Sequence, residues 1–420
     1  MGNIKDRLSL LSIDTENPNL ELVNQINDTF PGLHQLMLSI PDKSQCGTNR
    51  SVLLIGGGII GLLTAFYLSL EGFQVTLLEQ ESYGAAASGR NGGGILALGR
   101  DFHEIPLIKI SIDLWEQLSG FDIETQFVRS GHVMIAMNEY EAQKLGKAQE
   151  LYQRAGLETQ WIEPKQALQK LPDLSPQNFG GLSSSSDAQG YPFITINSLV
   201  KKLKSLGCQL INHCKVTGFK VVNDKVTSVA TDQGDFHADE VVLCTGPWTE
   251  KLGSLLDVHL PIQPRRSPIM VTEIVHTRRM DPFVSGNNLY MRQTHAGNIL
   301  FGGGGSWEPT GFNVSGSVDV IKRLSTYFTE LFPSFQALHL IRSFAGTVEI
   351  TPDHRPLLGI VSPYTNLHVS AGYSGHGYGM SAFAAKLLAK QLLYKALEQD
   401  LPQSLEVVSK TFSPSRLGGR

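Results

Sequence analysis

Three glycines and one acidic residue among the first hundred positions have the spacing of a dinucleotide site. Gly56, Gly58 and Gly61 form the pattern G-x-G-x-x-G, and Glu79 follows the third glycine by 18 positions. In such a site the first glycine permits a tight turn, the second lets backbone N–H groups approach a pyrophosphate, and the third lets a helix pack on a strand. A carboxylate at position 79 binds an adenosine ribose and disfavours the 2′-phosphate of NADP. The pattern therefore predicts binding of a dinucleotide.

A second glycine-rich segment, residues 84–94, interrupts the alternation of strands and helices with the sequence GAAASGRNGGG. Its near-absent side chains allow the backbone to lie against a planar ring. Arg90 and Asn91 stand between the glycines, where they suit fixed polar contacts. The segment favours FAD over NAD, and a flexible linker is the alternative for this composition.

Tyr290, Arg292 and His376 are the candidates for substrate binding and catalysis. Tyr290 and Arg292 are two positions apart in an expected strand and so share one face. The arginine can bind a carboxylate through two hydrogen bonds. In the alternative interpretation, both residues belong to a row of polar side chains on the protein surface. His376 lies in a glycine-rich turn. There it is placed to contact flavin or substrate. In the alternative interpretation, its imidazole forms hydrogen bonds with backbone groups of the turn and has no role in the site.

Other residues with reactive side chains have structural interpretations. Ser374 resembles a hydrolase nucleophile, but His376 stands where G-x-S-x-G requires glycine, which disfavours a hydrolase. The remaining groups are expected to be solvated charges at Arg265, Arg266, Arg278 and Arg279, a core thiol at Cys244, and a solvated turn at residues 183–186.

Elements with the periodicity of an α/β protein must position these residues. The apolar run at 51–55 predicts a buried parallel strand, residues 62–70 a buried helix, and residues 73–78 a second strand. Later helices are expected at 108–120, 139–155, 196–206 and 380–397, and later strands at 131–137, 209–212, 216–222, 226–231, 289–292 and 298–301. The last helix carries three lysines on an otherwise apolar body, which favours amphipathic packing over a membrane anchor: Lys386, Lys390 and Lys395.

Composition limits the class of protein. A length of 420 residues predicts two or three domains. The 35 Lys+Arg against 39 Asp+Glu give a formal charge of -4 without a long basic run, which disfavours nucleic acid as a partner. Four scattered cysteines predict a reducing compartment, and the 12 histidines lack metal-ligand spacing, so no metal is expected. Without a pattern for a signal peptide, lipid anchor or membrane span, a soluble cytoplasmic protein is expected.

From residue 51 to about 417, the sequence resembles the FAD-dependent amine and amino-acid oxidoreductases of the D-amino-acid-oxidase/sarcosine-oxidase family. The motifs that carry the resemblance are residues 55–61 with Glu79, 87–93, Val216, 244–248, 351–353 and 372–377. Residues 290–297, YMRQTHAG, are most similar to the branch of the sarcosine oxidase β-subunit and hydrogen cyanide synthase.

The resemblance implies a mixed α/β fold in which a Rossmann-like FAD-binding domain of the glutathione-reductase type is joined to a substrate domain on an antiparallel sheet. The implied FAD-binding domain comprises residues 51–130, 194–260 and 342–420, the substrate domain comprises 131–193 and 261–341, and residues 1–50 form an extension of unknown role. The implied cofactor-binding residues are Gly56, Gly58, Ile59, Ile60, Gly61, Glu79, Gln80, Ser88, Arg90, Asn91, Gly92, Gly93, Val216, Thr245, Gly246, Trp248, Gly375, His376, Gly377, Tyr378 and Gly379.

In the implied pose, FAD is extended and its flavin lies between residues 88–93 and 375–379. The N-terminus of the helix after the second segment would stabilise the negative charge of a reduced flavin.

The sequence departs from the family at several positions. Val348 replaces the carboxylate-binding arginine of D-amino-acid and glycine oxidases, and Leu96 and Gly379 replace basic residues of monomeric sarcosine oxidases. Gly346 replaces the cysteine that tethers flavin, which predicts non-covalent FAD. Leu300 replaces an oxygen-activating lysine, which favours a dehydrogenase over an oxidase.

The expected function is oxidation of the C–N bond of a secondary amine or amino acid similar to sarcosine, glycine or proline. Hydride would pass to flavin N5 and leave an imine. The chain would act alone or as the flavin subunit of a hetero-oligomeric dehydrogenase, with a partner subunit or an external electron acceptor. Two other classes stay open, a non-catalytic FAD-binding assembly protein and a nicotinamide dehydrogenase.

Overall fold

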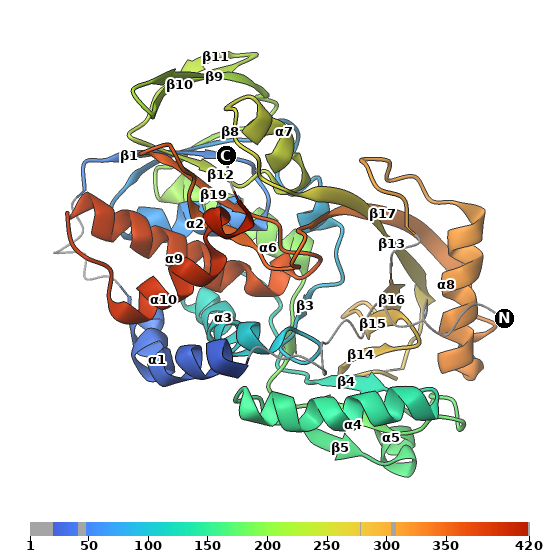
Figure 1. The fold of residues 1–420 in the computed structure, drawn as a ribbon. Helices are drawn as coiled ribbons and strands as arrows, with labels where there is room; N and C mark the ends of the chain where they lie inside the picture. Colours follow the sequence, from blue (N-terminus) through green and yellow to red (C-terminus); the bar gives the residue numbers. More distant parts are fainter. Residues whose placement is uncertain (1–19, 41–47, 278, 304–307, 419–420) are drawn as a thin grey trace.

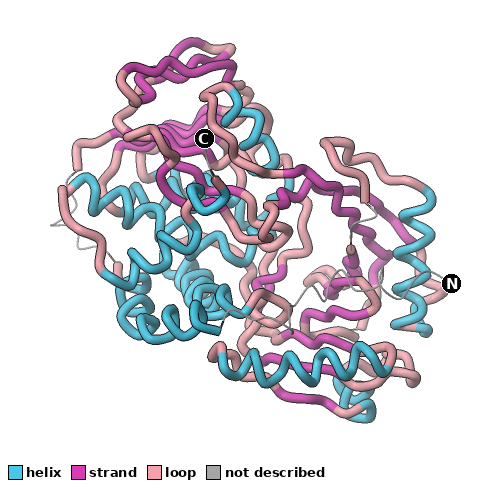
Figure 2. The backbone as a smooth tube through the Cα atoms, in the orientation of Figure 1, coloured by secondary structure: helices cyan, strands magenta, loops and turns pink. Residues whose placement is uncertain are grey.

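The protein is built on two large β-sheets that lie side by side (Figure 1). The computed structural model describes residues 20–40, 48–277, 279–303 and 308–418. Figure 2 shows most of the helices gathered around the first sheet, while the strands of the second sheet form a separate group. This arrangement confirms the expected mixed α/β fold.

The first sheet has six strands in the order β18-β19-β12-β1-β2-β8. Its parallel strands are β1 (Ser51–Ile55), β2 (Gln74–Leu78), β8 (Gln209–Ile211), β12 (Glu240–Leu243) and β19 (Leu367–Ala371), and β18 (Leu357–Ile360) pairs antiparallel at one edge. Side chains of β1 alternate between two cores, because Val52 and Leu54 pack toward helices while Leu53 and Ile55 pack on the opposite face. The continuous apolar run therefore forms a strand that is buried on both faces.

Helices cover one face of this sheet and a small sheet covers the other (Figure 1). The helices around it are α2 (Ile59–Leu70), α3 (Ile105–Gln117), α6 (Pro192–Ser205), α9 (Gly377–Ala396) and α10 (Gln403–Phe412). The three-stranded sheet consists of β9 (Val216–Val222), β10 (Lys225–Thr231) and β11 (Gly234–Phe236), and α7 (Thr249–Ser254) follows β12.

The second sheet has eight strands in the order β17-β13-β16-β15-β14-β4-β6-β5 and is antiparallel except where β4 pairs with β14. Its strands are β4 (His132–Ile135), β5 (Gln160–Ile162), β6 (Gly181–Ser184), β13 (Gln263–Ile274), β14 (Phe283–Gly286), β15 (Leu289–Gln293), β16 (Asn298–Gly302) and β17 (Leu340–Ile350). The helices beside it are α4 (Glu139–Arg154), α5 (Pro164–Lys170) and α8 (Val318–Leu331). Leu289 and Met291 of β15 pack in the core that α8 completes, so Tyr290 and Arg292 point to the opposite face.

A two-stranded sheet of β3 (Gly94–Ile95) and β7 (Ala188–Gln189) lies between the two large sheets. Before β1, helix α1 (Leu20–Leu38) packs against α3 and α10. Leu33 and Met37 of α1 are completely buried, and the Nζ of Lys386 on α9 donates a hydrogen bond of 2.8 Å to the carbonyl of Ser39. Residues 20–40, which lie outside the family resemblance, are thus an additional packed layer.

The lysines of α9 differ from expectation. Lys386 and Lys390 are buried, and Lys390 pairs with buried Glu71 at 2.8 Å. Burial lowers the pKa of Lys386 to about 8. The amphipathic interpretation was therefore wrong for these two residues, because neighbouring elements supply partners that the sequence of the helix does not reveal.

Other local predictions also required correction. Helix α2 begins at Ile59 rather than at residue 62, because Gly58 is its N-cap, and α9 begins at Gly377 rather than at about 380. Ser183 and Ser184 belong to β6, and Ser184 is buried, so they are not a solvated turn.

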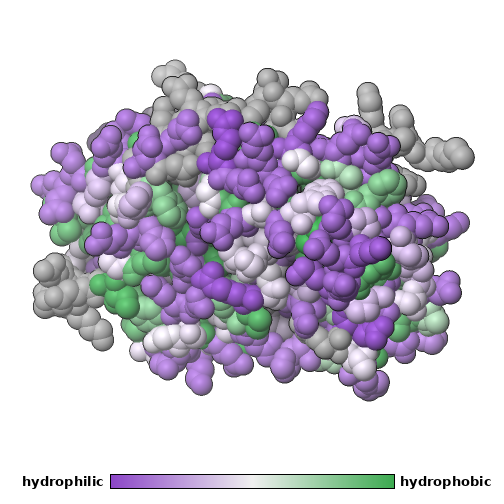
Figure 3. All heavy atoms as spheres, turned by 90° about the horizontal axis from the view of Figure 1, so that it is seen from below, coloured by the Kyte–Doolittle hydropathy of each residue, from purple (hydrophilic) through white to green (hydrophobic). Residues whose placement is uncertain are grey.

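Among the described residues, no helix combines the length and the apolar character that crossing a membrane requires. The face of the molecule shown in Figure 3 is mostly hydrophilic, with hydrophobic side chains scattered between the polar ones.

Candidate cofactor and active site

The turn after β1 is shaped by glycines for which no larger residue fits. Gly56 has a φ of 111°, and a Cβ there would collide with the carbonyl of Cys244, which directly follows the neighbouring strand β12. A Cβ at Gly61 would collide with the carbonyl of Gly56 itself, and one at Gly58 would lie 2.9 Å from Ser88 Oγ. The three glycines therefore keep side chains away from the backbone at the start of α2, as the binding of a pyrophosphate there requires.

Glu79 and Ser88 hold this turn from two sides. The N–H groups of Gly57 and Glu81 donate to the two carboxylate oxygens of Glu79, at 2.7 and 2.8 Å. Burial raises the pKa of Glu79, and these hydrogen bonds oppose the shift. Ser88 Oγ accepts a hydrogen bond of 2.9 Å from the N–H of Ile59, the first residue of α2. The predicted ribose-binding carboxylate is thus fixed at the end of β2.

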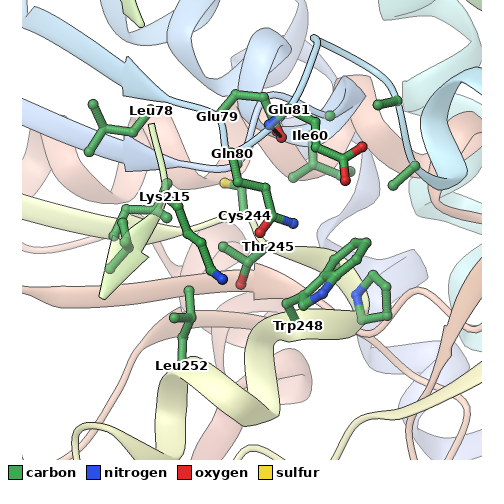
Figure 4. Close-up of a pocket in the computed structure, with 18 of the residues that line it drawn as sticks. Ile60, Leu78, Glu79, Gln80, Glu81, Lys215, Cys244, Thr245, Trp248 and Leu252 are labelled. Atoms are coloured by element: carbon green, nitrogen blue, oxygen red, sulfur yellow. Dashed lines mark hydrogen bonds between the residues drawn. The ribbon is translucent and has the colours of Figure 1, made fainter. Parts of the chain in front are cut away.

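A cavity of about 410 Å³ opens beside the turn. In Figure 4 the side chains of Gln80, Lys215, Thr245 and Trp248 surround a common space below the end of β2. Of the predicted cofactor residues, those that line the cavity are Gly56, Gly58, Ile60, Glu79, Gln80, Ser88, Val216, Thr245, Gly246 and Trp248. Ile59 and Gly61 shape the adjoining turn.

Sequence reasoning missed several residues that line the cavity. Lys215 and Thr217 flank the predicted Val216, and Leu252 follows the predicted Trp248 by four positions, so proximity to these two residues was the available signal. Cys244 lines the cavity as well as packing in the core. Burial raises the pKa of its thiol to about 12, which keeps it protonated and unreactive at neutral pH.

The loop at residues 84–93 is folded by its own hydrogen bonds. Asn91 Nδ2 donates to the carbonyl of Ser88 at 2.7 Å, and Asn91 Oδ1 accepts from the N–H of Gly93 at 2.8 Å. Arg90 reaches the carbonyl of Ala345 on β17 at 3.3 Å. These contacts contradict the alternative of a flexible linker and fix the loop against the second sheet.

Two glycines of this loop face the predicted substrate residues. A Cβ at Gly92 would lie 2.7 Å from the ring of Tyr290, and one at Gly93 would lie 3.1 Å from a terminal nitrogen of Arg292. Arg292 is buried, and its guanidinium carbon lies 5.7 Å from the centroid of the Tyr191 ring. Burial raises the pKa of Tyr290 to about 12. The structure thus brings Tyr290 and Arg292 together at the loop, and the alternative of a row of polar side chains on the surface was wrong.

The glycine-rich turn before α9 holds His376 at the N-cap of the helix. Gly375 has a φ of 93°, and Gly377 begins α9. The His376 Nε2 lies 3.0 Å from Glu104 Oε1, and both side chains are buried. The alternative of a ring satisfied by backbone was therefore wrong. Sequence reasoning missed Glu104 because it lies 272 positions away.

The next two residues of α9 connect this turn to its surroundings. Tyr378 Oη lies 3.1 Å from Thr195 Oγ1, and burial raises its pKa. The carbonyl of Gly379 accepts hydrogen bonds from Ser111 Oγ at 2.6 Å and Trp115 Nε1 at 3.2 Å. A Cβ at Gly379 would lie 3.2 Å from Ile95 of β3. The turn at residues 375–379 therefore contacts β3, the strand that directly follows the loop at residues 84–93.

The prediction of a solvated charge was wrong for Arg266, which is buried, whereas Arg279 is exposed as expected although it forms an ion pair. Arg266 is buried and donates to Glu308 at 2.6 Å, and Arg279 binds both oxygens of Asp173 at 2.6 and 2.7 Å. Arg278 lies outside the described residues. Within the described residues, no three His, Cys, Asp or Glu side chains are grouped so that they could hold a metal ion.

A parallel sheet with a glycine cradle, beside an antiparallel sheet that carries a buried arginine, is the arrangement of a dinucleotide-binding enzyme. Residues 51–391 match the family model described as "DAO: FAD dependent oxidoreductase". The chain therefore belongs to this family and is an FAD-dependent oxidoreductase. The interpretation as a nicotinamide dehydrogenase was wrong.

Two named relatives agree with this assignment, and one solved structure shares the fold. The chain is 26% identical over 400 residues to the sarcosine oxidase subunit beta of Arthrobacter sp, covering 90% of this chain and 95% of the relative. It is 26% identical over 358 residues to a glycine oxidase of Pseudomonas putida, covering 82% and 94%. The structure of L-proline dehydrogenase from P. horikoshii matches with a TM-score of 0.80 and 24% identity over 88% of this chain and 98% of that one.

The residues present fit FAD. The cradle at Gly56 and Gly58 admits backbone contact with a pyrophosphate where any Cβ would intrude. The carboxylate of Glu79 suits a ribose, and the cavity beside it is lined by both polar and apolar side chains.

Proposed function

We propose that the protein oxidises the C–N bond of a small amino acid with a primary or secondary amine, similar to sarcosine, glycine or proline. The observation that carries this proposal is the position of Arg292, a buried cation on β15 beside Gly93 of the loop. The names of the relatives, which include sarcosine oxidase and glycine oxidase, support the same class of substrate.

We propose an extended pose for the cofactor. The pyrophosphate would bind at residues 56–61, the ribose at Glu79 and the adenine against Val216. Ser88, Arg90, Asn91, Gly92 and Gly93 on one side and residues 375–379 on the other would hold the flavin. FAD is the hydride acceptor that the oxidation requires. Because Gly346 stands where the tethering cysteine would be, the cofactor is bound without a covalent link.

Arg292 would bind the substrate carboxylate. A planar guanidinium holds a carboxylate through two parallel hydrogen bonds, and burial strengthens the interaction because water does not compete. Tyr191 stacks near the guanidinium, and Tyr290 lies two residues away on the same face of β15. Together they would orient the α-carbon and its hydrogen toward the loop at Gly92 and Gly93.

His376 would contact flavin or substrate from the N-cap of α9. Glu104 fixes the orientation of its imidazole through the hydrogen bond of 3.0 Å. We propose Glu104 as a positioning residue in this part of the site, since its carboxylate acts through His376.

The electron acceptor is a separate part of the proposal. Leu300 pairs with Arg292 across β15 and β16, so an apolar residue stands beside the proposed substrate site instead of the oxygen-activating lysine. This favours a dehydrogenase that passes electrons to a partner subunit or another acceptor. A free-standing oxidase is the alternative, and oxygen consumption during turnover distinguishes the two.

The test is the visible spectrum of the protein under anaerobic conditions. Sarcosine, glycine, proline and D-amino acids are added one at a time while the flavin band near about 450 nm is followed. Bleaching by one of them supports the proposal and identifies the substrate class. A flavin band that none of them bleaches contradicts it and favours an assembly role.

A further inference from the structure

Glu349 is a buried acid near the end of β17 that the roles described so far do not use. Its Oε1 accepts a hydrogen bond of 3.2 Å from the N–H of Tyr373. Its Oε2 is buried and has no hydrogen-bond partner among the residues that the structure describes. A buried carboxylate oxygen without a partner is costly. Glu349 therefore has the capacity to hold one more polar group.

The side chain lies at the cofactor cavity. Glu349 and Gly246 both line it, and a Cβ at Gly246 would lie 3.3 Å from Glu349 Oε2. The missing side chain at position 246 thus leaves room next to the unpartnered oxygen. Gly246 itself has a φ of 50°, a conformation that favours glycine.

The position of Glu349 corresponds to the middle of an extended dinucleotide. Glu79 and Val216 line the same cavity, and Gly56 of the cradle lies against the carbonyl of Cys244. Glu349 lies next to Gly246, two residues after Cys244, and accepts a hydrogen bond from the N–H of Tyr373 at the start of the turn that leads to the proposed flavin site. The chain of FAD between its pyrophosphate and its flavin is a ribityl chain that carries three hydroxyl groups.

We propose that Glu349 Oε2 accepts a hydrogen bond from a ribityl hydroxyl of FAD. This inference rests on the family's cofactor and the proposed pose, and it adds a binding residue that neither the motif nor the comparisons assign. A hydroxyl suits the position because it can donate to a carboxylate, whereas a pyrophosphate would repel one.

The surroundings of Glu349 agree with a neutral polar partner. The Cys244 thiol and the Tyr373 hydroxyl are titratable groups that interact with Glu349, and burial raises the pKa of both, so both stay uncharged. Burial raises the pKa of Glu349 to about 7, against the hydrogen bonds from the N–H groups of Gly372 and Tyr373. A hydroxyl donor would favour the ionised form and lower this pKa.

The test compares ligands that differ at the proposed contact. Apoprotein is titrated with FAD, with FAD analogues that lack the 2′-, 3′- or 4′-hydroxyl of the ribityl chain, and with ADP. The proteins are the natural chain, Glu349→Gln, and Glu273→Gln as a control, because Glu273 is a partly exposed residue of β13 that does not line the cavity. Binding is followed by flavin fluorescence or by calorimetry.

We expect Glu349→Gln to weaken FAD binding about tenfold, as loss of one charge-assisted hydrogen bond does. ADP binding should stay unchanged, because ADP carries no ribityl chain. One of the three analogues should bind the natural chain about tenfold more weakly than FAD, and the same analogue should show little loss with Glu349→Gln. Glu273→Gln should behave like the natural chain throughout.

Two results would overturn the proposal. The first is equal binding of FAD and all three analogues by the natural chain, a comparison that needs no variant to fold. The second is a Glu349→Gln protein that binds ADP normally and still discriminates among the analogues as the natural chain does. Failure of amines to bleach the flavin would leave the hydroxyl contact standing, whereas absence of FAD binding by the natural chain would remove both proposals.

Discussion

The two ends of the proposed cofactor site are built in different ways. The cradle is a backbone structure within one short stretch, where Gly56, Gly58 and Gly61 clear space and Glu79 and Ser88 hold the turn. The substrate end is a side-chain structure assembled from distant segments, with Arg292 from the second sheet and His376 paired to Glu104. Changes at the first end should therefore affect cofactor binding, and changes at the second should affect turnover.

The largest effect is expected at the cradle. Gly56→Ala would place a Cβ against the carbonyl of Cys244 at a φ that alanine rarely adopts. We expect purified protein without bound FAD and a loss of affinity of at least about 100-fold, since backbone atoms must move. Flavin content after purification measures it.

Gly146→Ala is the matched control for the cradle, because its Cβ would meet nothing within 4 Å in helix α4. It should keep its flavin and gain up to about 1 kcal/mol of stability. Full flavin content in Gly56→Ala would contradict the view of the cradle as a backbone structure.

The next largest effect is expected at Arg292. Arg292→Met should keep its flavin but lower kcat/KM for the amino-acid substrate on the order of 100-fold, since a buried charge pair is worth about 2–5 kcal/mol. An amine without a carboxylate, such as dimethylamine, should lose far less. Stopped-flow flavin reduction measures both.

Arg342→Met serves as the control, because Arg342 is an exposed residue of the same sheet. An equal loss for dimethylamine and for the amino acid would exclude Arg292 as the carboxylate-binding residue.

A smaller effect should appear in the pH dependence of apoprotein stability. The pKa of Glu349 is about 7 in the folded protein against an ordinary 4.5, so the folded state holds a proton that the unfolded state releases. Its contribution is fully present below about pH 4.5 and is lost as the pH rises through about 7. The difference in unfolding free energy between the natural chain and Glu349→Gln should fall by at most about 3 kcal/mol across this range. Urea unfolding at several pH values measures it, and a constant difference would contradict the prediction.

The smallest effect is expected at Ser88, which holds the cradle from the loop at residues 84–93. Ser88→Ala removes the acceptor for the N–H of Ile59. We expect a loss of about 1 kcal/mol in stability or FAD affinity, with flavin reduction in the holoprotein nearly unchanged. A large fall in the reduction rate would place Ser88 in the substrate end instead.

The same contrast explains what the sequence revealed. The order of strand, glycine turn, helix, strand and Glu79 was predictable because all its contacts lie within one stretch and follow from backbone geometry. The start of α2 was misplaced only because Gly58 acts as a cap. Tyr290 and Arg292 were predicted as a pair by their spacing, but their burial depends on Gly92 and Gly93, which precede them by about 200 positions.

Partners from distant elements were beyond prediction. Nothing near His376 in the sequence indicates Glu104, and nothing near Lys390 indicates Glu71, because each pair forms only when separate helices pack. The position of Glu349 two residues before the motif at 351–353 was the available signal for its role, but its unpartnered oxygen is visible only in the folded chain.

The order of the strands along the chain has a consequence for how the molecule holds together. The strands of the first sheet come from residues 51–78, 209–243 and 357–371, and those of the second come from 132–184 and 263–350. The polypeptide therefore passes between the sheets four times, and no single fragment of the gene encodes either sheet. Neither sheet can be removed or exchanged alone by cutting the chain at two positions. Unfolding of one sheet also frees the ends of the segments that form the other. Heat or denaturant should accordingly melt both sheets in one shared transition.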